Sequence, residues 1–192
     1  MMHSTKAVKQ AMSEREIAYQ RVLEKEKLSK AWRDMTRLFI SASSLIFLTL
    51  LSVWAIQHLP TIEVPTVYKW NVLVVALSSL FGVLAQRSIS NDDLSMAFKY
   101  TGWTMIFGIV FLMVQLIGWQ ELYENNHSFR NILLPFALVH ILHVTIGLGL
   151  LGRVFLKLTA HQVHSKEMML AKNAFRFWHF LGVVWLLVIL IS

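Results

Sequence analysis

The chain has 192 residues, of which 56% are hydrophobic and only 15% are charged, a balance too apolar for an ordinary soluble domain. Its net charge of +7 could suggest nucleic acid, but most basic residues stand beside apolar segments without interleaved aromatic residues. The absence of cysteine excludes disulfides, thiolate metal sites and cysteine catalysis. We therefore expect a membrane protein whose positive charges meet anionic lipid headgroups and not nucleic acid.

The first 36 residues form a basic arm with charges throughout. The stretch from about Ser4 to Met35 contains no Gly or Pro, which predicts a helix. Its apolar residues make only a ragged stripe, typical of a helix that is solvated or lies at the membrane interface; docking onto a partner subunit is the alternative. We expect no cleaved signal peptide, because no apolar region with a small-residue cleavage site occurs here.

Five later stretches approach the roughly 20 apolar residues that a helix needs to cross a bilayer. They predict an all-α integral membrane protein, a bundle of five transmembrane helices in a domain of residues 37–192. The predicted spans are approximately 38–57, 68–86, 100–119, 131–152 and 174–191. The second and fifth are short, and we expect amphipathic residues at their ends to snorkel and lengthen them: Tyr68, Lys69 and Trp70, and Arg176, Trp178 and His179.

The distribution of Lys and Arg predicts the orientation, because these residues accumulate on the cytoplasmic side. With the N-terminus inside, sixteen of them fall in cytoplasmic segments, and only Lys69 and Arg130 fall outside. We therefore expect a cytoplasmic N-terminal helix and, after five spans, a C-terminus outside.

A polar side chain at membrane depth is costly and needs a partner, so each one is a candidate functional residue. The predicted spans contain Asn71, Ser78, Ser79, Gln115, His140, His143 and His179. They contain no Asp or Glu, which weighs against a proton relay through carboxylates but leaves a histidine relay open. Small residues such as Ser43, Ser78 and Gly147 indicate where helices pack closely together.

His140 and His143 are three residues apart and lie on one helix face, and His179 could approach that face from the last span. Hydrogen bonding between helices is the simplest interpretation. Haem ligation requires histidines on facing helices, and two on one face cannot clamp one haem. A metal site of the three histidines would lack a carboxylate or thiolate ligand.

Two motifs near the end of the chain resemble subunit III of the haem-copper respiratory oxidases. His140-Ile-Leu-His143-Val144-Thr-Ile-Gly147 resembles the family's fourth-helix pattern. Phe177-Trp178-His179-Phe180, followed by Val183-Val184-Trp185, resembles its fifth-helix pattern. Asn71 with Ser78-Ser79, and Gln115 with Trp119, extend the resemblance to about residues 65–192. Five helices correspond to the short bacterial form of this family.

Two positions depart from the family pattern. Gly118 stands where the family often has Glu, and Gly182 stands where it often has Asp. Any family role that rests on those carboxylates is therefore not transferred to this chain.

The resemblance implies a cofactor-free accessory subunit with no catalytic residue, metal site or haem of its own. Its complex would reduce oxygen to water and translocate protons in aerobic electron transport, with haems and copper in partner subunits. The chain would stabilise catalytic subunit I, contact subunit II, and support proton uptake in the bacterial inner membrane. Subunit IV and a respiratory supercomplex are further candidate partners. Asn71, Gln115, His140, His143, Trp178, His179 and Trp185 would be structural or interface residues.

The family also holds phospholipids in a cleft between its first two helices and the remaining bundle. Lys157, His161 and Arg176 are candidate headgroup contacts on the cytoplasmic side, and solvated positive-inside residues are the equal alternative.

Two other functions remain open. A nitric oxide reductase accessory subunit shares this fold, and a b-type cytochrome could use His140, His143 and His179. Whether cytochrome c or quinol is the electron donor depends on another subunit.

Overall fold

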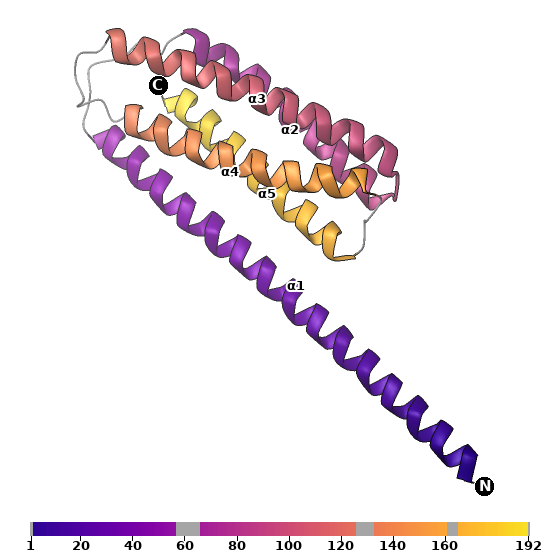
Figure 1. Cartoon of the computed structure of the whole chain (residues 1–192). Helices are drawn as coiled ribbons and strands as arrows, with labels where there is room; N and C mark the ends of the chain where they lie inside the picture. The colour runs from indigo at the N-terminus through magenta and orange to yellow at the C-terminus, as the bar shows by residue number, and fades with distance from the viewer. Residues whose placement is uncertain (1, 57–65, 126–132, 161–164, 192) are drawn as a thin grey trace. The chain divides into compact units, whose positions relative to one another are not determined.

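The computed structural model describes residues 2–56, 66–125, 133–160 and 165–191. Within these ranges the chain forms five helices (Figure 1): α1 (Met2–Ile56), α2 (Thr66–Ser90), α3 (Leu94–Asn125), α4 (Leu133–Thr159) and α5 (Ser165–Ile191). Each helix contains a segment long and apolar enough to cross a membrane. The predictions of an all-helical fold and of five spans are confirmed. The direction in which the chain crosses the membrane stays a prediction.

The helices are longer than the apolar spans predicted from the sequence. The second span was expected at 68–86, whereas α2 continues to Ser90; the fifth was expected at 174–191, whereas α5 begins at Ser165. The length of an apolar segment matches the thickness of the hydrocarbon core of the membrane. The backbone hydrogen bonds of the helix can continue beyond that core, so a helix can be longer than its apolar span. Likewise, α1 has no break between the basic arm and the first span.

The chain divides into two compact units, residues 1–38 and 39–192. In the first unit, the apolar side chains of Ile17, Val22 and Trp32 are all exposed. An ion pair joins Asp34 to Arg37 over 3.8 Å, and both side chains face solvent. An exposed pair of this kind contributes little stability. The cytoplasmic location of the arm, residues 1–36, stays a prediction.

The second unit contains a ring of four helices. The helix α2 packs against α3 and α5, and α4 also packs against α3 and α5, so the contacts close into a ring (Figure 1). The part of α1 from Phe39 onward contacts α4 and α5 through its side chains. The ring centroids of Phe47 and Phe136 lie 5.2 Å apart, as do those of Phe39 and Phe177. Asn71, Ser78, Gln115 and His140, which belong to helices of this ring, are all buried.

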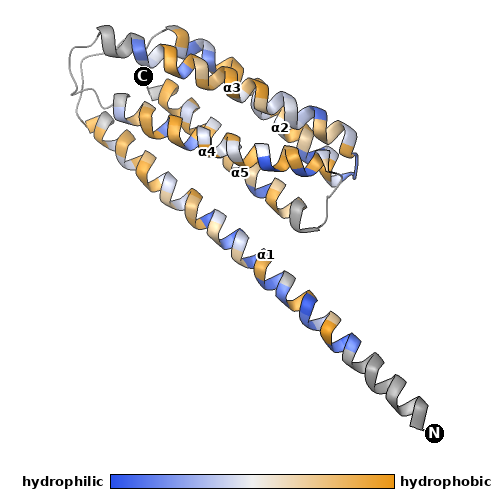
Figure 2. Ribbon diagram, viewed as in Figure 1, coloured by the Kyte–Doolittle hydropathy of each residue, from blue (hydrophilic) through white to orange (hydrophobic). Residues whose placement is uncertain are grey.

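This unit has a largely apolar surface, and its mainly apolar interior also contains several polar residues. Its buried residues include Asn71, Gln115 and His140, each with no exposed surface. Large apolar side chains face outward, as on α3, where an exposed stripe follows helical spacing: Trp103, Ile106, Val110, Met113 and Ile117. Figure 2 shows apolar residues along most of α2–α5, and polar residues gathered at the α2–α3 turn. An apolar surface, with the few polar side chains kept in the interior, suits a bundle in lipid.

The turn between α2 and α3 is built from three polar residues. The backbone N–H of Asn91 donates to the carbonyl oxygen of Arg87 over 3.0 Å. Asp92 adopts the left-handed conformation, with φ 57°, which Asp tolerates better than most residues. Asp93 caps α3, because its Oδ1 accepts a 3.1 Å hydrogen bond from the N–H of Met96. This short connection makes α2 and α3 antiparallel neighbours.

Candidate functional site

His143 connects α4 to α1. Its Nδ1 lies 2.7 Å from the carbonyl oxygen of Val139, one turn earlier on the same helix. A carbonyl can only accept, so Nδ1 carries the proton. In the neutral ring Nε2 is then an acceptor, and the hydroxyl of Ser43 donates to it over 3.1 Å. Both nitrogens of His143 are therefore used within the protein.

His179 connects α5 to α2. Its Nδ1 lies 2.6 Å from the hydroxyl oxygen of Ser79. Gly82, one turn further along α2, leaves room for the imidazole: a Cβ at this position would stand 3.3 Å from Cε1 of His179. The glycine thus lets the histidine ring lie against the α2 backbone.

Trp178 is the central packing residue of the four-helix ring. Its Nε1 donates to the hydroxyl oxygen of Ser78 on α2 over 3.0 Å. Ser78 in turn donates to the carbonyl oxygen of Thr104 on α3 over 2.9 Å. The indole also lies against two glycines, since a Cβ at Gly108 or Gly147 would stand 2.7 Å or 3.0 Å from it. One side chain of α5 therefore contacts α2, α3 and α4.

A cluster of rings surrounds His140 in the same interior. The ring centroid of His140 lies 5.3 Å from that of Trp185, with an interplanar angle of 26°. Phe111 meets His140 and Trp185 edge-on, at 5.8 Å from each. Asn71 donates from Nδ2 to the carbonyl oxygen of Phe111 over 3.3 Å. The carbonyl oxygen of Gln115 accepts a 3.3 Å hydrogen bond from the hydroxyl of Tyr68.

The three histidines do not converge on one site. His143 turns toward Ser43 on α1, whereas His179 bonds to Ser79 on α2. His140 has no protein partner for either nitrogen among the described residues. The structure does bring Asn71 and Trp185 together with His140 around Phe111, as the distances above show.

In the described part of the chain, the three histidines do not form a common set of ligands. Within the described ranges, no group of three His, Asp or Glu side chains is placed to hold a metal. His143 and His179 are engaged with serines of different helices, so they do not face each other as axial ligands would. The geometry therefore gives no support to the b-type cytochrome alternative.

Gly118, one of the two departures from the family pattern, has a steric cause. A Cβ at this position would stand 2.1 Å from Cε1 of Tyr68, so the tyrosine ring fills the space that a larger residue would need. At Gly182 a Cβ would stand 3.1 Å from Cγ1 of Val75, a milder conflict. In this chain a carboxylate at 118 would require Tyr68 to move.

The structure corrects the expected position of two aromatic residues. Tyr68 and Trp178 were expected to snorkel at the ends of short spans, but their side chains are 0% and 7% exposed. The packing role of Tyr68 was missed entirely. The glycine at 118 was the available signal, because a glycine within a span admits a large neighbouring side chain.

The candidate headgroup residues remain separate from this interior. Lys157 lies in the last turn of α4, where it is partly buried, and Arg176 is exposed on α5. His161 lies outside the described residues.

Comparison with known proteins agrees with the resemblance inferred from the sequence. No family model matches the chain. A curated relative, cytochrome c oxidase subunit 3 of Synechocystis sp., is 28% identical over 169 residues, which cover 80% of this chain and 71% of the relative. The chain is a relative of cytochrome c oxidase subunit III. The resemblance inferred from His140-Ile-Leu-His143 and Phe177-Trp178-His179-Phe180 is thereby confirmed.

Five helices agree with the short form of subunit III. The subunit III relationship and the five apolar helices together indicate a multi-pass membrane protein.

Proposed function

We propose that this chain is the cofactor-free subunit III of a proton-pumping terminal respiratory oxidase. In this role it packs against catalytic subunit I, stabilises it during turnover and supports proton uptake from the cytoplasmic side. The observation that carries the proposal is the 28% identity to cytochrome c oxidase subunit 3 over 80% of the chain.

The use of the polar side chains supports an accessory role. Ser43 with His143, Ser79 with His179, and Ser78 with Trp178 each connect one helix to another. Groups that are committed to such bonds hold a bundle together and are less available for chemistry. The polar interior is therefore suited to presenting a fixed surface to a neighbouring subunit.

The distribution of carboxylates supports proton transfer by a neighbour. Residues 39–53 of α1 and the apolar spans of α2–α5 contain no Asp or Glu. Proton pathways through membranes commonly use such residues. We infer that protons move through the catalytic subunit. This chain would support proton uptake by stabilising the structure around the entrance of that pathway.

Lipid contacts are part of the same proposal. Lys157 and Arg176 lie in parts of α4 and α5 that the charge distribution assigns to the cytoplasmic side. Fixed positive charge at that depth attracts anionic headgroups. Together with His161, these residues would hold phospholipid beside the bundle.

The test is purification of the complex from its native membrane. The chain carries an affinity tag, the membrane is extracted in mild detergent, and attached proteins are identified by mass spectrometry. We expect haem-copper oxidase subunits I and II. An untagged strain serves as the control for proteins that bind the resin.

Two results would overturn the proposal. Recovery of nitric oxide reductase subunits in place of the oxidase would assign the chain to that complex. A haem band in the oxidised-minus-reduced spectrum of the isolated chain would make it a cytochrome in its own right.

A further inference from the structure

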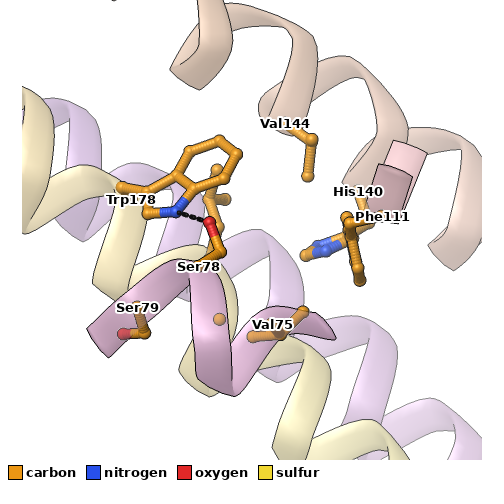
Figure 3. Close-up of a pocket in the computed structure, with 9 residues that line it drawn as sticks. Val75, Ser78, Ser79, Phe111, His140, Val144 and Trp178 are labelled. Carbon is orange, nitrogen blue, oxygen red and sulfur yellow. Dashed lines mark hydrogen bonds between the residues drawn. The ribbon is translucent and has the colours of Figure 1, made fainter. Parts of the chain in front are cut away.

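A small cavity lies between the helices of the four-helix ring, beside Ser78 and the cluster of rings around His140 (Figure 3). Every helix of the ring contributes to its wall, which includes Val75 and Ser78 of α2, Phe111 of α3, His140 of α4, and Trp178 and Leu181 of α5. The centre of a water molecule can occupy about 20 Å³ of it. One water needs roughly 10–15 Å³ on this measure, so the cavity has room for a single molecule of that size.

His140 is the polar group that the cavity leaves without a protein partner. Its side chain has no exposed surface, and within the described chain neither ring nitrogen has a hydrogen-bond partner. Figure 3 shows the imidazole pointing into the space bounded by Val75, Val144 and Ser78. Trp185 stacks on the ring at 5.3 Å, so the nitrogens at the ring edge are the groups that need a partner. A neutral imidazole has one donor and one acceptor nitrogen, and water can satisfy either.

Ser78 offers a second polar group in the cavity wall. Its hydroxyl donates to the carbonyl oxygen of Thr104 and accepts from Nε1 of Trp178. A hydroxyl oxygen has two lone pairs, so Ser78 can accept one further hydrogen bond. An internal water requires at least two polar partners, whereas a purely apolar cavity of this kind stays dry.

We propose that this cavity is a binding site for one internal water molecule, held by the imidazole of His140 with the hydroxyl of Ser78 as a second partner. The site goes beyond the subunit III role and does not depend on it. The water gives His140 a hydrogen-bond partner, and no charged side chain is among the described residues that line the cavity. One water satisfies one of the two imidazole nitrogens, which lowers the cost of burying this polar group.

The test is solid-state NMR of the full chain in lipid bilayers, with ¹⁵N-labelled histidine. Magnetisation is transferred from water to the imidazole nitrogens, and the His140 signals are identified by their loss in His140→Phe. We expect transfer to His140 but none to His143, whose two nitrogens are both bonded within the protein. Absence of transfer to His140, or a coupling between His140 and the amide of Gln115 in its place, would overturn the proposal.

A pair of valine variants provides a matched control. Val75→Leu adds a methylene to the cavity wall and leaves His140 intact, so we expect the water transfer to fall several-fold. Val83→Leu adds the same group on the exposed side of α2 and should leave the transfer unchanged. Equal transfer in both variants would show that the water lies elsewhere.

Discussion

The ring of Tyr68 lies against Gly118, so closely that a Cβ on the glycine would stand 2.1 Å from Cε1 of the ring. Tyr68 has no exposed surface, and its hydroxyl bonds to the carbonyl oxygen of Gln115 on the same neighbouring helix. The contact therefore fixes the start of α2 against α3 and determines which side chains position 118 tolerates.

We expect Gly118→Ala to destabilise the bundle by about 1–3 kcal/mol, the usual cost of overpacking. The measurement is the free energy of unfolding of the full chain in detergent. Tyr68→Phe retains the clashing ring and should not rescue the variant, whereas Tyr68→Ala should relieve the clash.

Gly149→Ala is the matched control, because a Cβ there would meet nothing within 4 Å. It should be neutral or stabilise the helix by up to about 1 kcal/mol, since alanine forms helices better than glycine. Equal destabilisation at both positions would contradict the steric explanation.

The hydrogen bond between Ser43 and His143 should give a measurable coupling between α1 and α4. In a double-mutant cycle of Ser43→Ala and His143→Leu, we expect a coupling of about 0.6 kcal/mol, the average for such bonds in a membrane protein. The cross-pair of Ser43→Ala with His179→Leu should be additive, because His179 bonds to Ser79. Coupling in the cross-pair would indicate a global change in packing and not a local bond.

Loss of the histidines should affect the complex without removing its haem. In His143→Leu or His179→Leu we expect weaker retention of the chain and faster loss of oxidase activity during prolonged turnover, because each variant removes an interhelical bond. Haem per catalytic subunit should stay unchanged, and this is measured from the reduced-minus-oxidised spectrum. A loss of haem in step with the histidine would show that the chain ligates it.

The predicted orientation can be tested by cysteine labelling, since the natural chain has no cysteine. Lys69→Cys should react with a membrane-impermeant maleimide in intact cells, because Lys69 is expected outside. Asn91→Cys, in the exposed turn between α2 and α3, should react only after permeabilisation. The opposite pattern would place the N-terminus outside.

The sequence was sufficient to predict the five membrane-spanning helices. It was not sufficient to predict which side chains of different helices contact each other. Apolar length alone predicted five spans, because lipid imposes the same requirement on every crossing segment. Which side chains meet depends on the rotation of each helix about its axis. Three residues correspond to about 300° of helical turn, so His140 and His143 differ in direction by about 60°. That difference is enough for one to reach Ser43 on α1 while the other faces the cavity.

The candidate polar residues could be predicted because a polar side chain within a membrane span is energetically costly. This argument applies to each residue separately and does not identify its partner. Their partners could not be read in the same way, since Ser43 and Ser79 look like ordinary small residues of a packing seam. The burial of Tyr68 was missed because a tyrosine at the end of an apolar stretch is typical of the membrane interface. Only its contact with a glycine of another helix distinguishes it.

In each of the three serine bonds, the serine is synthesised before its partner. Ser43, Ser78 and Ser79 each precede their partners, His143, Trp178 and His179, by 100 residues. During synthesis, the serine helices therefore leave the ribosome well before the side chains that complete them. Until its partner is inserted, a serine hydroxyl can donate a hydrogen bond to the backbone of its own helix, as Ser44 does to the carbonyl oxygen of Ile40. The hydroxyl is then not left unpaired in lipid. The partner side chains are inserted later, when the three serines are already in the membrane.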